Sequence, residues 1–418
     1  MRIAHVTPWG IRCGVARHLS YWLALANGDN EHLILASNPP HWYGNPEDWL
    51  DIPCIRCWER AQDDALTNVW REAQTFGADV IHLQYDAQFW HWTAIGPFLE
   101  QAHRAGVPVV ATAHVLHDLT ENFTRANCAL LESVDLLVVG TPAMREAFEN
   151  YAKQFHFSMR RPVLEIPLAV PTPPTGTVAK EALGPTVVSF GFLGGHKGHD
   201  GVIEGVRQMR SRGYPDARYI VAGDAFTGEQ RQTLEALRAH EKATPGMVIA
   251  RAGFMTEDEI YRLCQGADLV VFNHRLNYRS SSGTVLFGIT SGTPVVVADV
   301  PMLTSGFDGV VWPVGDGPED WSTAMVRALG AGDVRAEVQA AAAKRLAAPV
   351  VAAQYEAVYR KLKEGEVVAP AKTEPGAKLS KAQLAAALFE MATENLADQD
   401  RLAKLLAAAG LLLNEVEG

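Results

Sequence analysis

The sequence predicts two doubly wound α/β domains in series, with a helical extension at the C-terminal end. Short, continuously apolar segments alternate with segments of helical length, which is typical of parallel sheets buried on both faces. This pattern is interrupted at residues 167–174, where repeated prolines predict a linker, and then it restarts. A length of 418 residues also favours two domains over one. Because ligands bind at the carboxyl ends of parallel strands, we expect the functional site in a central cleft that both domains face.

Residues 1–170 form the first predicted domain. Its apolar segments are separated by stretches long enough for helices, as α/β units require. In chain order we expect a strand at 3–6, a helix at 15–26, and strands at 32–36, 80–83, 107–111 and 136–139.

Residues 182–345 form the second predicted domain, in which the same pattern begins again. A glycine-rich turn follows its first strand, and a helix is expected from about residue 200. The other predicted elements are strands at 186–190, 219–222, 248–249, 268–272 and 294–298, and a helix at 285–290.

The C-terminal part is predicted to contain a helix at 346–363 that packs back on the protein, a linker at 364–378 and a helical tail at 379–418. A capping-box pattern at Ser380 and Gln383 precedes a leucine-rich stripe, so the tail is predicted to form one or two amphipathic helices. Such a stripe must bury its apolar face. Two alternatives stay open: contact with another copy of the chain, which gives a homo-oligomer, or packing on its own protein.

Composition narrows the class of protein. Hydrophobic residues make up 48% and charged residues 20%, which indicates a folded soluble protein rather than a disordered one. The formal charge of −11 argues against nucleic acid as a partner. No apolar run is long enough to span a membrane, and five cysteines are too few for a disulfide framework, so a cytoplasmic protein is expected.

Known metal and hydrolase motifs are missing from the sequence. Cys54 and Cys57 form a CxxC, but no second cysteine or histidine pair stands at zinc-binding distance along the chain. Neither H-E-x-x-H nor G-x-S-x-G occurs. We therefore expect no metal site.

The loop after the strand at 186–190 is suited to bind a phosphate. Its glycines, including Gly191 and Gly195, allow close approach of the backbone. Lys197 adds a positive charge just before a predicted helix, whose first amides are unpaired. The alternative is a glycine-rich turn with a surface lysine.

A second loop of this kind follows the strand at 268–272. Arg275 and Arg279 supply positive charge, and a group of hydroxyl residues and a glycine opens the next helix. Two such loops at strand ends favour a diphosphate ligand, whereas serines that act only as N-caps are the alternative. The residues that open the helix are Ser281, Ser282, Gly283 and Thr284.

Two features of the first domain point toward the same cleft. Gly14 lies between the first strand and the first helix, where backbone amides can reach a ligand. His114 follows the strand at 107–111 and can donate to a sugar hydroxyl or phosphate oxygen, or move a proton. A solvent-facing loop histidine is the alternative.

Tryptophan is concentrated at the start of the chain, with eight of ten residues in the first 92. Some of these aromatic side chains must form the core. Others, with Trp9, Tyr85 and Trp90 as candidates, are expected to present flat faces to a sugar or lipid-linked glycan acceptor.

Taken in order, these segments resemble the GT-B glycosyltransferases, specifically the retaining family known as group 1 or family four. The resemblance implies two Rossmann-like domains, a nucleotide-sugar donor held mainly by the second, an acceptor on the first, and no required metal or cofactor. It covers about residues 1–363 and rests on segments at 13–16, 78–85, 113–114, 191–198, 221–223, 253–254, 267–271, 281–284 and 292–296.

Carried over to this sequence, the resemblance implies His114, Lys197 and Arg279 as catalytic residues. It also implies front-side attack, in which the diphosphate oxygen takes the acceptor proton. The implied donor-binding residues are Gly14, Gly191, Gly195, Lys197, Gly253, Phe254, Arg275, Ser281, Ser282, Gly283 and Thr284.

The chain departs from the family pattern in the loop after the strand at 268–272 and in the loop after the strand at 186–190. Many members carry two glutamates eight positions apart, and Arg279 and Phe287 stand at those places here. The second glutamate usually holds the nucleotide ribose, so that contact is lost. Phe192 likewise replaces an arginine that often precedes the phosphate-binding lysine.

The expected function is metal-independent transfer of a sugar, with retention, from a nucleotide-diphosphate sugar to a sugar, lipid-linked glycan or protein acceptor. Any contact with a membrane is expected to be made through the acceptor. Two alternatives remain: a GT-B-fold epimerase that acts on the nucleotide sugar, and a non-catalytic nucleotide-sugar-binding or scaffold protein.

Overall fold

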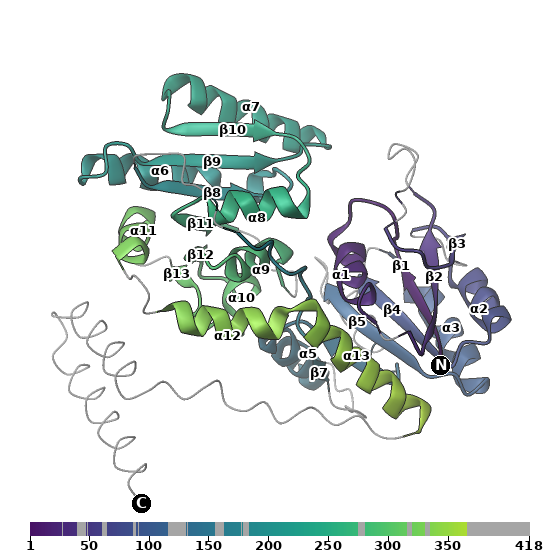
Figure 1. Ribbon diagram of the computed structural model, residues 1–418. Helices are drawn as coiled ribbons and strands as arrows, with labels where there is room; N and C mark the ends of the chain where they lie inside the picture. The colour runs from purple at the N-terminus through teal and green to yellow at the C-terminus, as the bar shows by residue number, and fades with distance from the viewer. Residues whose placement is uncertain are drawn as a thin grey trace, which may run out of the picture. The chain divides into compact units, whose positions relative to one another are not determined.

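The described strands form two separate parallel sheets within one compact unit, Met1–Pro370 (Figure 1). The computed structural model describes residues 1–26, 28–39, 47, 49–60, 65–86, 89–90, 92–115, 131, 133–154, 163–176, 178, 184–274, 281–315, 320–330 and 335–365. The predicted linker beyond Gly365 and the predicted tail at 379–418 lie outside these residues.

The first sheet has seven parallel strands in the order β3-β2-β1-β4-β5-β6-β7. Its switch point lies between β1 and β4, because the chain adds strands on one side of β1 and then on the other. The elements are β1 (Arg2–Thr7), α1 (Gly14–Leu23), β2 (Glu31–Ser37), β3 (Cys54–Trp58), α2 (Ala65–Phe76), β4 (Val80–Asp86), α3 (Trp92–Arg104), β5 (Val109–Val115), β6 (Leu136–Val139), α5 (Pro142–Gln154) and β7 (Leu164–Glu165).

Helices cover both faces of this sheet. Alternate residues of β1 point to opposite sides, so that Ala4 and Val6 join a core formed with α2, α3 and α5. Ile3 joins a different core, which contains α1 and also the last described helix, α13 (Ala348–Lys363). A helix that follows the second domain in sequence therefore completes the core of the first.

The second sheet has six parallel strands in the order β10-β9-β8-β11-β12-β13, with its switch point between β8 and β11. The elements are β8 (Thr186–Phe190), the 3-10 helix η1 (Gly195–Lys197), α6 (His199–Ser211), β9 (Arg218–Gly223), α7 (Gly228–Ala243), β10 (Val248–Ala252), α8 (Glu257–Gln265), β11 (Leu269–Phe272), α9 (Gly283–Thr290), β12 (Val295–Ala298), α10 (Pro301–Thr304), β13 (Trp312–Val314), α11 (Trp321–Gly330) and α12 (Ala336–Leu346).

This sheet is also buried on both sides. Val187 of β8 packs with α6, α7 and α11, whereas its neighbour Val188 packs with α8, α9, α10 and α12. The prediction of two doubly wound α/β domains is thus confirmed.

The proline-rich stretch at 167–174 is packed rather than exposed along much of its length. Ala169 and Val170 are buried, and the amide of Ala169 donates to Nδ1 of His18 at 2.8 Å. Val170 pairs with Ala347, immediately before α13. At residues 169–170, the connection between the sheets is therefore held by contacts with α1 of the first domain and with the residue that precedes α13.

The CxxC segment forms part of β3, which the sequence did not predict. The described residues contain no cluster of three or more potential metal-ligating side chains. Within the same residues, no helix has the length and apolar character needed to cross a membrane.

Candidate functional site

The carboxyl edge of the second sheet is built from glycine backbone. Gly191, Gly223 and Gly253 stand at the ends of β8, β9 and β10. The amide of Gly191 donates to Ala222 O at 3.1 Å, and that of Gly253 donates to Gly223 O at 2.9 Å. A Cβ on Gly223 would lie 1.9 Å from Gly191 O, so no side chain fits there. The edge therefore presents main chain instead of side chains to a ligand.

Lys197 and the start of α9 meet at Gly191. The residue has φ +111, and a Cβ there would lie 3.3 Å from Lys197 Nζ and 3.1 Å from Thr284 Cγ2. Lys197 ends η1, which follows β8, whereas Thr284 belongs to the helix after β11. The positive side chain of one predicted phosphate loop and the helix start of the other therefore come together beside the switch point of the sheet.

The first turn of α9 is not capped by the side chain that precedes it. Ser282 occupies the N-cap position, but its hydroxyl lies 2.8 Å from the hydroxyl of Thr284 and makes no capping bond. Ser282 is thus the N-cap residue by position only, since its side chain makes no capping hydrogen bond. Unpaired amides at a helix start favour an anion. Ser281 lies close to Gly140 at the end of β6, with 3.8 Å between its Cβ and a Cβ built on that glycine.

Asn273 fixes the two loops of the second domain to each other. Its Nδ2 donates to Gly198 O at 2.7 Å, and Gly198 adopts a left-handed conformation with φ +59. A Cβ at Gly198 would lie 2.5 Å from Asn273 O, which excludes other residues. Nearby, the amide of Gly195 donates to Oε1 of Glu229 at 3.0 Å.

Two positions at which many members of the group 1 family carry glutamate are occupied here by Arg279 and Phe287, and the structure describes one of the two. Arg279, like Arg275, lies outside the described residues. Phe287 is a core residue of α9 that packs against Tyr261 and Tyr21, with ring centroids 4.9 Å and 6.3 Å away. This position therefore supports the packing between α9, α8 and α1 and offers no carboxylate to a ribose.

In the first domain, Gly14 begins α1 and has open space around it. No atom lies within 4 Å of a Cβ built on this glycine, and the preceding Cys13 makes no side-chain capping bond. The start of α1 therefore resembles the start of α9 in leaving amides uncapped by a side chain.

His114 is the penultimate residue of β5 and is almost fully buried, with 7% of its surface exposed. Its Nε2 lies 2.9 Å from Oε1 of Gln84, and its ring centroid lies 5.8 Å from that of His18 on α1. The alternative of a solvent-facing loop histidine is therefore excluded. Both contacts belong to the first domain.

The expectation for the aromatic acceptor residues requires correction. Trp9, Tyr85 and Trp90 are 3%, 0% and 1% exposed and pack inside the cores of the first domain. Large aromatic side chains bury most apolar area when packed, and the first sheet uses them for this purpose. None of the three presents an open face to an acceptor in this structure.

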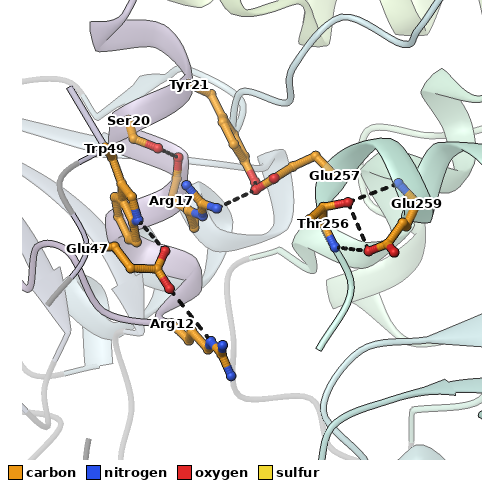
Figure 2. Close-up of polar contacts among 9 residues, drawn as sticks. All are labelled: Arg12, Arg17, Ser20, Tyr21, Glu47, Trp49, Thr256, Glu257 and Glu259. Carbon is orange, nitrogen blue, oxygen red and sulfur yellow. Dashed lines mark hydrogen bonds and ion pairs between the residues drawn. The ribbon is translucent and has the colours of Figure 1, made fainter. Parts of the chain in front are cut away.

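Contacts from α1 to the second domain converge on one carboxylate, Glu257 at the start of α8 (Figure 2). The hydroxyl of Tyr21 donates to Glu257 Oε1 at 2.8 Å, and Arg17 Nη2 lies 3.0 Å from the same oxygen. Burial, and then the nearby carboxylate, raises the pKa of Tyr21, so its hydroxyl remains a donor. A capping box between Thr256 and Glu259 fixes the helix start that carries Glu257.

Arg12 makes a second connection between the domains. Its Nη1 lies 3.5 Å from Oδ2 of Asp224, and its guanidinium lies 4.1 Å from the ring centroid of Phe254. Phe254 is 39% exposed and follows Gly253 at the end of β10. An arginine from the first domain thus covers an exposed aromatic ring at the edge of the second sheet.

Sequence reasoning missed Arg12, Arg17, Tyr21 and Glu257. Arg17 and Tyr21 are four positions apart on a predicted helix, which places them on one face. That spacing was visible in the sequence. Their partner is 236 positions beyond Tyr21, and no local pattern could identify it.

The comparisons with known proteins agree with this geometry. Residues 184–331 match the family model described as Glycosyl transferases group 1. Most of the second domain is therefore similar to this family. Lys197, Thr284 and the glycine edge all lie inside the matched residues. No curated protein matches the chain closely enough to count as a relative.

Solved structures with the same fold include three bacterial proteins. Alr3699/HepE of Anabaena, crystallised with UDP, has a TM-score of 0.65 and 16% identity over 86% of this chain and 100% of its own; it was also crystallised with UDP-glucose. A glycosyltransferase from Rickettsia africae has a TM-score of 0.63 and 12% identity, covering 86% and 98%. A UDP-forming α,α-trehalose-phosphate synthase from Burkholderia vietnamiensis has a TM-score of 0.60 and 12% identity, covering 86% and 100%. The fold of this chain is therefore GT-B, and the residues that match the group 1 family model lie in its second half.

Proposed function

We propose that this chain transfers a sugar from a nucleotide-diphosphate sugar to an acceptor hydroxyl. The observation that carries the proposal is the meeting of Lys197 and the first turn of α9 at Gly191, within the residues that match the group 1 family model. Negative charge develops on the diphosphate as the glycosidic bond breaks. Positive groups fixed beside that charge lower the energy of the transition state more than that of the bound donor.

The roles of the other groups follow from their positions. The glycine edge formed by Gly191, Gly223 and Gly253 admits the nucleotide close to the backbone. The start of α1 at Gly14 supplies amides to the diphosphate from the first domain. His114, beyond the switch point of the first sheet, contacts the transferred sugar. The resemblance to the group 1 family further supports Arg275 and Arg279, which lie outside the described residues, as sources of positive charge for the diphosphate.

We further propose that the transfer proceeds with retention and needs no divalent metal ion. Lys197 and the uncapped helix start can supply the positive potential that a metal supplies in other transferases. Retention is supported by the resemblance to the group 1 family, through front-side attack in which the diphosphate oxygen takes the acceptor proton.

A transfer assay on the full chain tests this proposal. UDP-glucose is the first donor to try, because the Anabaena protein binds it, followed by other nucleotide sugars in a thermal-shift screen. A donor at ~100 times its Kd should stabilise the fold by ~2.7 kcal/mol. Donors that stabilise the chain are then incubated with sugar acceptors, with and without EDTA, and the anomeric configuration of the product is read by NMR.

We expect a product with the anomeric configuration of the donor, formed at the same rate in EDTA. Loss of activity in EDTA that manganese or magnesium restores would overturn metal independence alone. Donor binding without transfer to any acceptor, and without hydrolysis above that of Lys197→Ala, would overturn the proposed transfer.

A further inference from the structure

A buried chain of hydrogen bonds runs from α13 through the first sheet to His114. Tyr359 Oη lies 2.6 Å from Nδ1 of His82, and Gln84 Nε2 lies 3.1 Å from Nε2 of the same ring. The carbonyl end of Gln84, Oε1, lies 2.9 Å from Nε2 of His114. Every side chain in this chain is at most 7% exposed. Bulk water therefore has little access to these hydrogen bonds.

The strands set this geometry. His82 and Gln84 are two apart on β4 and so point to the same face. The pairing of β4 with β5 places Thr112 beside Gln84. Thr112 Oγ1 lies 2.7 Å from Nε2 of His82 and 3.0 Å from the hydroxyl of Tyr355, one helical turn before Tyr359 on α13.

The amide of Gln84 couples the protonation of the two imidazole rings. Burial, and then the nearby His114, lowers the pKa of His82 to about 3, so this ring is neutral and carries one N–H. Because Gln84 donates to Nε2 of His82, the N–H of His82 lies on Nδ1 and donates to Tyr359. Because the other end of the amide is an acceptor, Nε2 of His114 must carry a proton.

We propose that Gln84 is a positioning residue that holds neutral His114 in the Nε2–H form, and that Tyr359 sets this form from the C-terminal helix through His82 and Gln84. Nδ1 of His114 is then the acceptor nitrogen, and any group that bonds to it must be a donor, as a sugar hydroxyl is. The inference rests on the proposed function in one respect, which is that His114 contacts the sugar.

The hydroxyl of Tyr359 is the acceptor that keeps the proton of His82 on Nδ1. Without it, the His82 proton moves to Nε2, where Thr112 accepts it. Gln84 must then turn its carbonyl toward His82 and its amino end toward His114. His114 would change to the Nδ1–H form, although it is 245 positions from the substituted residue along the chain.

The two tyrosines of α13 make a matched pair for the experiment. Both are fully buried, both bond through one hydroxyl, and Tyr355 bonds to Thr112 instead of His82. Tyr359→Phe and Tyr355→Phe therefore each remove one buried hydroxyl from the same helix. Full chain labelled with ¹⁵N-histidine is prepared for the wild type and both variants, and His114→Asn assigns the His114 signals in long-range ¹H–¹⁵N spectra.

We expect Nε2–H for His114 in the wild type and in Tyr355→Phe, and a shift toward Nδ1–H in Tyr359→Phe. Gln84→Met, which removes both ends of the amide, should give a mixture of the two forms. Nδ1–H in the wild type, or the same form of His114 in Tyr359→Phe and Gln84→Met as in the wild type, would overturn the inference.

Kinetics separate positioning from simple stability. Tyr359→Phe should lower kcat by about tenfold, because a misdirected group at the reacting sugar costs rate even when the fold survives. Tyr355→Phe should leave kcat within about twofold while losing a similar buried hydrogen bond. The NMR result does not depend on turnover, so a chain that transfers no sugar would refute the proposed function without deciding the inference.

Discussion

The two sheet edges assigned to the substrate are built in different ways. The edge of the second sheet consists of glycine backbone, with Gly191, Gly223 and Gly253 at successive strand ends and one lysine beside them. The edge of the first sheet has His114, which is bonded to Gln84 and connected through His82 to Tyr359 on a helix that follows the second domain. One edge is specified by local sequence, whereas the other depends on contacts between distant segments.

This difference fits the ligands that we assign to the two sides. A diphosphate is bound by amides and charge, which glycine loops and helix starts provide wherever they occur. A sugar is recognised through hydroxyls, which require side chains in a defined protonation state. We therefore expect substitutions at the second edge to affect diphosphate chemistry directly, and those behind the first edge to act through His114.

The largest effect is expected for Lys197→Ala. Removal of the ammonium next to Gly191 should lower donor turnover by ~10²-fold or more, because its charge faces the developing charge of the diphosphate. Lys242, an exposed residue of α7 in the same domain, provides the control variant Lys242→Ala. Steady-state kinetics with thermal melting will show whether the loss is catalytic. Turnover near that of the wild type would remove Lys197 from the site.

A smaller effect is expected where a methyl group is added to a helix start. Gly283→Ala at α9 should raise the Kd of the donor by about tenfold, since the added Cβ stands between the backbone and the anion. Gly228 also begins a helix, α7, and Cβ atoms built on both glycines meet no protein atom within 4 Å. Gly228→Ala should therefore leave both stability and donor Kd unchanged.

Titration calorimetry with the donor nucleotide measures the Kd of Gly283→Ala and of its control Gly228→Ala. Gly14→Ala extends the test to the start of α1, where the space is also open, and a weaker effect there would show that the second domain dominates diphosphate binding. Equal donor affinity in Gly283→Ala and the wild type would contradict the assignment of α9 to the anion.

The fold and the second edge could be predicted from sequence because their signals are local. Continuous apolar strands such as 186–190 and 268–272 indicate a parallel sheet by themselves. Gly191 and Lys197 lie in the loop directly after a strand, and the hydroxyl residues at 281–284 directly before a helix. No contact between distant residues had to be known.

The first edge could not be predicted in the same way. Tyr85 and Trp90 are aromatic, as expected of an acceptor surface, but both are buried in a core that contains residues of α2 and α3. His82 and Gln84 could be seen on one strand, whereas Tyr359 is 277 positions beyond His82. Which side of a sheet a returning helix covers depends on tertiary packing, so neither the burial of these residues nor their partners follow from a local pattern.

We expect acid to destabilise the two domains to different extents, because they contain different numbers of buried histidines with lowered pKa values. Burial lowers the pKa of His82 and of His199 to about 3 each, against 6.5 in the unfolded chain. The unfolded state therefore binds more protons between pH 6.5 and 3, and stability falls as the pH falls through this window. Each such histidine contributes about 1.4 kcal/mol per pH unit.

The first domain should lose stability first. Burial also lowers the pKa values of His5, His18 and His32, all in the first domain, whereas His199 is the described histidine with a lowered pKa in the second. Hydrogen exchange at pH 7, 6 and 5, corrected for intrinsic rates, should show protection falling earlier in β1, β4 and β5 than in β8 and β11. Earlier loss in the second sheet would contradict this account.

His199→Asn is the matched variant for the acid experiment. Asparagine keeps a polar group near the hydroxyl of Tyr219, to which Nδ1 of His199 is bonded at 2.9 Å, but it cannot titrate. It should flatten the pH dependence of β8 and its neighbours and leave that of the first sheet unchanged.

The smallest effect is expected where the two domains touch, at Glu257→Gln. The glutamine keeps an oxygen that can accept from Tyr21 but loses the charge that attracts Arg17. The side chains of Arg17 and Glu257 are 25% and 28% exposed, so solvent screens the pair and its loss should cost at most about 1 kcal/mol. This contact favours the approach of the carboxyl edges of the two sheets. We therefore expect Glu257→Gln to raise the donor KM about twofold and to leave kcat unchanged.

Asp258→Asn is the control for this variant, because Asp258 is the next carboxylate along and pairs with Arg262 of the same helix at 2.7 Å. Its donor KM should equal that of the wild type. The difference between the two variants should shrink at high salt, since the attraction between partly exposed charges is screened. A KM shift in Asp258→Asn as large as that in Glu257→Gln would show that the charge of α8, and not its contact with α1, matters to the donor.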